Sequence, residues 1–153
     1  MAVSLRSSIA KRRSHLNAAL CRIQLDKIWR FMKVSLEAVY SILTEWARKG
    51  SAQTYTDLSN EYYDITGEWL EPHGNWDHPL GELANLVCSA GCPPITALVV
   101  LKGKNEPGGD FWGCAPNVPS RPKDEMVRLG EWIRMTNECF AHTWTDSLPV
   151  TTA

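Results

Sequence analysis

The sequence lacks any long hydrophobic run and any secretory signal, and these absences exclude two classes of protein. No stretch approaches the roughly 18 consecutive apolar residues that a membrane-spanning helix needs. The longest early apolar stretch, Leu16 to Cys21, is too short for a signal-peptide core and is bracketed by Arg13 and Arg22. We therefore expect a cytoplasmic globular protein with no membrane partner. Its 153 residues are enough for one domain with an arm.

The sequence also lacks the even number of cysteines that full disulfide pairing within a chain requires. An odd count without a signal sequence favours reduced thiols, and the five are Cys21, Cys88, Cys92, Cys114 and Cys139. The spacings Cys88-x3-Cys92 and Cys139-x2-His142 could still close a tetrahedral zinc site, with Cys114 between them. A cysteine paired with His73, His78 or His142 could act as a nucleophile. Neither pattern matches a recognised motif, so we expect no metal, no cofactor and no catalytic residue.

Positive charge is absent from one segment and concentrated in another. Residues 51–91 contain no Lys or Arg and seven acids, whereas residues 1–50 contain ten bases against three acids, a net charge of +7. The overall charge of −1 hides this segregation. It predicts two surfaces of opposite sign, one suited to phosphates and one suited to a basic protein partner.

Helical periodicity predicts three helices in the first two thirds of the chain. The first runs from Ser35 to Lys49 with one continuous apolar stripe and ends at Gly50. The second has Thr56 as its N-cap and ends at Gly67, with inward residues Leu58, Tyr62 and Ile65. The third runs from Pro79 to Ala90, with Asp77 or His78 as the cap, Pro79 at the first helical position and Gly91 after its end.

A β-ribbon and a fourth helix are predicted to follow. Ile95 to Leu101 is apolar and β-branched, which is typical of a strand, and Asp110 to Trp112 is its short return strand. Lys123 to His142 is predicted to be helical, with apolar positions Met126, Val127, Ile133 and Phe140.

These elements predict an α+β fold with a winged helix-turn-helix-like core of three helices and a short β-ribbon, flanked by a C-terminal helix. The expected boundaries are a basic N-terminal extension (1–31), a single domain (32–145) and a tail (146–153) pinned by Trp144.

The central stretch carries four motifs of a known family. Its sequences are Thr54-Tyr55-Thr56-Asp57-Leu58-Ser59, His78-Pro79-Leu80-Gly81, Thr96-Ala97-Leu98-Val99-Val100 and Gly108-Gly109-Asp110-Phe111-Trp112-Gly113. In this order they resemble the winged-helix C-terminal domain of the O6-alkylguanine-DNA alkyltransferases and the alkyltransferase-like proteins. The stretch also resembles small uncharacterised bacterial and phage proteins. The alkyltransferase resemblance implies a DNA-binding fold.

The same resemblance excludes the family's chemistry. The position of the reactive cysteine holds Ala97, and that of its activating histidine holds Leu98, so no thiolate forms there. The DNA-intruding arginine of the family falls at His78.

We expect a non-enzymatic recognition module of bacterial or phage origin that binds DNA or another nucleic acid. The predicted contacts are in the arm, the helix start and the wing: Lys11, Arg12, Arg13, His78, Lys102 and Lys104.

Two alternatives remain open. The first is a protein-binding inhibitor or adaptor, possibly a nucleic-acid mimic, that uses the acidic 51–91 face through Asp57, Glu61, Asp64 and Glu68. The second is a metal-dependent enzyme that uses the polar cluster of His73, Asp77 and His78.

Overall fold

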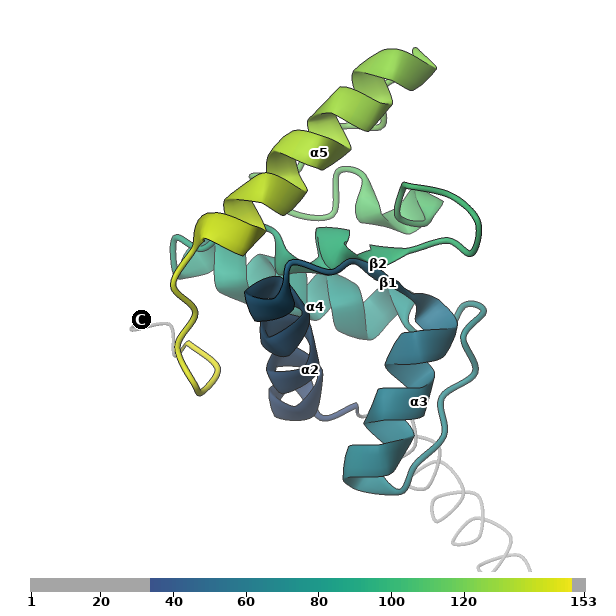
Figure 1. Cartoon of the computed structure of the whole chain (residues 1–153), viewed down its shortest axis with the longest axis vertical. Coiled ribbons are helices and arrows are strands. Elements are labelled where there is room, and N and C mark those ends of the chain that lie inside the picture. Colours follow the sequence, from purple (N-terminus) through teal and green to yellow (C-terminus); the bar gives the residue numbers. More distant parts are fainter. Residues whose placement is uncertain (1–33, 150–153) are drawn as a thin grey trace, which may run out of the picture. The chain divides into compact units, whose positions relative to one another are not determined.

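The chain divides into two compact units, Met1–Val34 and Ser35–Ala153, and the computed structural model describes residues 34–149. The second unit holds the helices and strands of Figure 1, which confirms the α+β class. The predicted basic extension lies outside the described residues. The elements are α2 (Leu36–Lys49), β1 (Gln53–Thr54), α3 (Tyr55–Thr66), α4 (Asp77–Ser89), the 3₁₀ helix η1 (Ile95–Leu98), β2 (Val99–Val100), the 3₁₀ helix η2 (Gly109–Phe111) and α5 (Glu125–Ala141).

Helix α2 has the bounds that its sequence predicts. The Ser35 hydroxyl accepts a hydrogen bond from the Ala38 N–H at 3.2 Å, and Gly50 ends the helix with a φ of 67°. Its apolar stripe is buried, with Val39 and Trp46 exposed by 0% and 1%. This helix is confirmed because its signals are local: a cap, a stripe and a left-handed glycine.

Helix α3 begins two residues earlier than predicted. Thr54, not Thr56, is its N-cap, because Thr54 and Asp57 form a reciprocal capping box. The Asp57 N–H donates to the Thr54 hydroxyl at 3.2 Å, and the Thr54 N–H donates to the Asp57 carboxylate at 3.1 Å. Gly67 ends the helix as predicted. The inward placement of Ile65 is wrong, since its side chain is 57% exposed.

A buried tryptophan sets the start of α4. Trp76 is fully buried and is the N-cap residue, so the helix begins at Asp77 and the predicted caps, Asp77 and His78, lie inside its first turn. The Trp76 indole N–H donates to the Ser59 hydroxyl at 2.8 Å, which in turn donates to the Leu70 carbonyl at 2.6 Å. These two bonds fix the long connection between α3 and α4.

The predicted strand from Ile95 to Leu101 is wrong over its first four residues, which form η1. The turn begins at Pro94, whose carbonyl accepts from the Ala97 N–H at 3.0 Å. Helices α2, α4 and α5 all contact η1, and its four side chains are buried. A run that is apolar on every side has no period to separate a strand from a buried turn of helix.

The predicted β-ribbon is also wrong. Strand β2 pairs in parallel with β1, with Gln53 opposite Val99, and α3, α4 and η1 form the crossover between the two strands. The return segment forms η2, in which the Phe111 N–H donates to the Gly108 carbonyl at 3.1 Å. The wing of a winged helix is therefore not formed in the part of the chain that the structure describes.

Helix α5 lies across the strands from α2 and α3, and its N-terminal end extends beyond the other elements (Figure 1). Three of its apolar side chains lie in solvent, because Met126, Val127 and Ile133 are 74%, 54% and 43% exposed. Met135 and Cys139 face the core instead.

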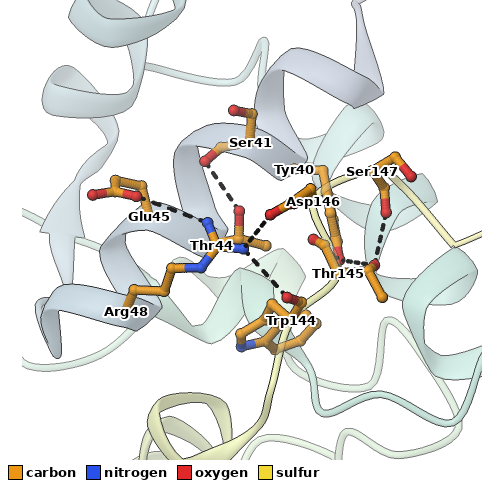
Figure 2. Close-up of polar contacts among 9 residues, drawn as sticks. All are labelled: Tyr40, Ser41, Thr44, Glu45, Arg48, Trp144, Thr145, Asp146 and Ser147. Carbon is orange, nitrogen blue, oxygen red and sulfur yellow. Dashed lines mark hydrogen bonds and ion pairs between the residues drawn. The ribbon is translucent and has the colours of Figure 1, made fainter.

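The segment after α5 is held against α2, as Figure 2 shows. Trp144 is buried, and its indole N–H donates to the Cys139 carbonyl at 2.8 Å. The Tyr40 hydroxyl donates to the Thr145 carbonyl at 3.1 Å, and Arg48 donates to the Trp144 carbonyl at 3.3 Å. Trp144 therefore anchors the C-terminal segment, as the sequence predicts.

Candidate functional site

A small cavity gathers polar side chains from five separate segments of the domain. Its volume is about 20 Å³, which is enough for one water-sized group. We call it the Asp77–Asp110 cavity, and its walls are Tyr55, Asp77, Leu80, Gly81, Thr96, Asp110, Phe111 and Cys114.

Two carboxyl groups meet at this cavity. Asp77 comes from the first turn of α4 and Asp110 from η2, and both residues line the cavity. Burial and the neighbouring Asp110 carboxyl together raise the pKa of Asp77. Asp77 therefore binds a proton more readily than a solvated aspartate does.

Tyr55 closes one side of the cavity. Its hydroxyl accepts a hydrogen bond from the Gly108 N–H at 3.0 Å, which leaves the phenolic proton free to donate elsewhere. A Cβ at position 108 would lie 3.0 Å from that hydroxyl, so the contact favours glycine there. Burial raises the pKa of Tyr55, and the charges of Asp77 and Asp110 raise it further. Tyr55 is thus a neutral donor.

Thr96 supplies a hydroxyl without a partner. Its side chain is 3% exposed, and its Oγ1 has no hydrogen bond among the described residues. Buried polar atoms are nearly always hydrogen-bonded, so this one calls for a physical explanation.

A larger hollow of about 230 Å³ adjoins the cavity and shares Tyr55 and Asp77 with it. His73 and Lys102 bring two further polar groups to its walls. The remaining lining residues are Thr54, Thr56, Pro72, Gly74, Leu101 and Gly108. We call it the Lys102 hollow.

A third hollow, of about 440 Å³, lies at the other end of the loop 101–106 and includes Lys104 and Arg121. Glu106 lies between the charges of this hollow. Its carboxylate accepts from the Arg128 Nε–H at 2.6 Å and lies 3.7 Å from the Arg121 guanidinium. The hydrogen bond from Arg128 lowers the pKa of Glu106.

The predicted nucleic-acid contacts do not all lie on one surface element. Lys102 and Lys104 are exposed on one loop, whereas His78 lines none of these three hollows and lies 2.8 Å from Glu82 on the exposed face of α4. Lys11, Arg12 and Arg13 lie outside the described residues. Sequence reasoning missed Arg121, which stood in a proline-rich segment with no motif around it.

The four residues of the predicted acidic face fall into two groups. Asp57 caps α3, and the Glu61 carboxylate accepts from the Trp46 indole N–H at 2.6 Å, so both have structural tasks. Asp64 and Glu68 are exposed.

The four cysteines in the described range, Cys88, Cys92, Cys114 and Cys139, form no cluster with metal-binding geometry. Between residues 34 and 149, no three His, Cys, Asp or Glu side chains group closely enough to hold a metal ion. Burial raises the pKa of Cys92, Cys114 and Cys139, which disfavours the nucleophilic thiolate. The Cys139 thiol donates to the Pro94 carbonyl at 3.3 Å.

Of the predicted polar cluster, His73 and Asp77 line one hollow and His78 does not. Tyr55, Thr96 and Asp110, which complete the cavity, were not predicted as site residues.

No protein-family model, curated protein or solved structure matches this chain. The resemblance to alkyltransferase-like domains therefore stays a prediction. None of the helices in the described range combines the length and apolar character that crossing a bilayer requires.

Proposed function

We propose that this chain is a non-enzymatic recognition module of bacterial or phage origin that associates with nucleic acid through its basic arm and the loop 101–106. One observation carries the proposal: this loop places Lys102 at one hollow and Lys104 beside Arg121 at another. Neither lysine has an ion pair within 4.0 Å in the described chain. Such side chains are available to phosphates.

The charges around Lys104 favour an anion. Glu106 is close to Lys104, but its charge is already compensated by Arg128, with a 2.6 Å contact. The 3.7 Å approach of Arg121 to Glu106 is partly exposed and therefore weak. Among the residues that line this hollow, Lys104, Arg121 and Arg128 outnumber Glu106 and Glu125, which leaves a small net positive charge for a phosphate backbone.

Of the winged-helix assignment, this proposal keeps only the order of the three helices. The order α2, α3, α4 suits a helix-turn-helix, but α4 carries no Lys or Arg, and His78 is next to Glu82. We therefore assign the phosphate contacts to the loop and to Lys11, Arg12 and Arg13, and none to a groove-reading helix.

The test is the salt dependence of nucleic-acid binding by the full-length chain, measured by fluorescence anisotropy. Lys102→Gln, Lys104→Gln and Arg121→Gln combined should reduce the log–log salt slope by about 2 to 3, since each lost phosphate contact removes roughly 0.7 to 0.9. The matched control is Arg48→Gln, Lys49→Gln and Arg134→Gln, which removes the same charge from residues already paired with acids. Equal slopes for the two triple variants, or no binding at low salt, would contradict the proposal.

A second candidate function is protein binding through the acidic face, and one observation favours it. Tyr63 and Trp69 form an edge-to-face pair with ring centroids 6.5 Å apart, and both remain 52% and 40% exposed beside Asp64 and Glu68. Aromatic side chains are enriched at protein–protein interfaces, so this exposed pair favours a protein-contact surface. If the wild type binds no nucleic acid at low salt, the double variant Asp64→Lys, Glu68→Lys tests this second function. It should bind a basic protein partner more weakly than the wild type does.

A further inference from the structure

We propose that the exposed aromatic pair of Tyr63 and Trp69 is the docking site for an arginine-bearing basic segment of a partner protein. We call it the Trp69 surface, and it includes the three acids of the same stretch, Asp64, Glu68 and Glu71. The inference rests on the second candidate function, whose partner it names, and it is independent of the nucleic-acid contacts.

The first argument is the exposure of two aromatic rings that touch each other. Tyr63 belongs to the last turns of α3 and Trp69 to the connection that follows, and Gly67 turns the chain between them with a φ of 76°. The rings meet edge to face at an interplanar angle of 73°, yet 52% of Tyr63 and 40% of Trp69 stay in contact with solvent. Single exposed apolar residues are ordinary on protein surfaces, whereas rings packed together in solvent indicate an interaction site.

The second argument is that the backbone beneath Trp69 is fixed by buried and local hydrogen bonds. On one side of Trp69, the Leu70 carbonyl accepts from the buried Ser59 hydroxyl at 2.6 Å. On the other side, the Glu68 N–H donates to the Thr66 hydroxyl at 3.1 Å. A ring held on a fixed backbone loses little conformational entropy when a partner binds, so this surface is organised before binding.

The third argument is charge, which selects a cationic partner. In the described chain, Asp64, Glu68 and Glu71 have no Lys, Arg or His within 4.0 Å. The exposed Glu45, by contrast, lies 3.8 Å from a lysine of its own helix. Residues 51–91 contain no Lys or Arg that could compensate these acids. The surface therefore repels phosphates and attracts a basic protein segment.

The side chains of the surface favour arginine over lysine. An indole face is the best aromatic acceptor of a cation, and a planar guanidinium stacks on it more readily than an ammonium does. The Glu71 carboxylate lies 3.3 Å from the Trp69 indole nitrogen, so an acid is at the edge of the same ring. A guanidinium on Trp69 would stack on the ring and have a carboxylate within reach of its donors.

The ring is tested by fluorescence anisotropy of the full-length chain with a labelled peptide of alternating arginine and glycine. A lysine–glycine peptide of the same length and charge is the comparison, and we expect the arginine peptide to bind more tightly. Trp69→Ala should weaken binding of the arginine peptide about 3- to 30-fold, and Trp69→Phe should weaken it less, because a ring is retained. The control Ile133→Ala shortens an apolar side chain of α5 that is 43% exposed and should bind as the wild type does.

The charges are tested with the same peptide. Glu68→Gln combined with Glu71→Gln should weaken binding by up to about fivefold for each charge removed, and less at high salt. The matched control is Glu45→Gln with Glu138→Gln, which removes the same charge from acids that already have basic partners. The control should keep the affinity of the wild type.

The outcomes separate this inference from the function on which it rests. Equal affinity for the two peptides, with weaker binding in the Glu68→Gln, Glu71→Gln variant, would keep the acidic face as a protein contact and overturn the arginine site. Absence of binding to either peptide would overturn both, as would equal binding by the two glutamine variants. If sedimentation velocity shows that the wild type self-associates and that Trp69→Ala does not, a second copy of the chain occupies the surface and the proposal is wrong.

Discussion

Replacing Ser59 by alanine should destabilise the domain, although the change removes a single heavy atom. The Ser59 hydroxyl accepts from the Trp76 indole N–H at 2.8 Å and donates to the Leu70 carbonyl at 2.6 Å. Ser59 and Trp76 are both fully buried, and Leu70 is 3% exposed. Alanine has nearly the same volume, so the change removes two hydrogen bonds and almost no packing.

The expected cost follows from the two groups left without partners. A buried donor or acceptor that loses its partner costs about 1–3 kcal/mol. Trp76 and Leu70 would each lose one, so Ser59→Ala should lower the free energy of unfolding by about 2–6 kcal/mol. Domains of this size are stable by only about 5–15 kcal/mol, so the loss is a large fraction. Because Trp76 directly precedes Asp77, the same bonds hold the first turn of α4 at the cavity.

Urea unfolding followed by tryptophan fluorescence measures this change, with the midpoint and slope fitted separately. Ser89→Ala is the matched control, because Ser89 is exposed at the end of α4 and its loss should change stability by less than about 0.5 kcal/mol. A cost below about 1 kcal/mol for Ser59→Ala, at an unchanged slope, would refute the reasoning.

Two further predictions concern Glu106, in the loop that carries Lys102 and Lys104, and Tyr55, whose hydroxyl accepts from the Gly108 N–H. Glu106→Gln should lower the free energy of unfolding by about 1–3 kcal/mol at pH 7, because the carboxylate is 2.6 Å from the buried Arg128. The control is Glu45→Gln, which changes an exposed side chain of α2 and should cost less than about 0.5 kcal/mol. Since Arg128 lowers the pKa of Glu106, this stabilisation is complete above the unfolded pKa of about 4.3 and is lost as pH falls through the lowered folded value. The unfolding free energies of wild type and Glu106→Gln should therefore converge in acid, and parallel pH curves would contradict this. Tyr55→Phe removes the acceptor of the Gly108 N–H, so it should cost about 1 kcal/mol and speed hydrogen exchange of that amide; an unchanged rate would mean the bond is not formed.

The helices were predictable where their signals are local. The stripe of α2, its Ser35 cap and its Gly50 end all lie within 16 consecutive residues and agree with one another. The N-cap of α3 was also predictable from sequence. Thr54 and Asp57 have the spacing of a capping box, and this signal is stronger than a single threonine at position 56.

The η1 segment could not be predicted from its own residues. Its four side chains are buried because α2, α4 and α5 converge on it, and this is a property of packing between distant elements. Only Val99–Val100 of the predicted first strand remain extended, and they pair with β1 while the return segment forms η2, so the β-ribbon of a winged helix is not formed in the described residues. The core positions of α5 were missed for a related reason: Arg128 is buried through its ion pair with Glu106, and Met126 and Val127 remain in solvent.

The site was predictable only in part. Asp77 belonged to a polar cluster and Tyr55 to a recognised helix start, so both stood out in sequence. Asp110 and Thr96 did not, because each is a common residue that becomes notable only when η1, η2 and α4 bring it beside Asp77. The pairing depends on tertiary contacts that no local pattern encodes.

The Asp77–Asp110 cavity breaks two rules that most of the domain obeys. Like charges are close together without a base in the walls, and a buried threonine hydroxyl lacks a partner, one of only three such buried side-chain atoms among the described residues. Each departure costs stability. Departures of this kind are expected where a site is built to bind something rather than to hold the fold together.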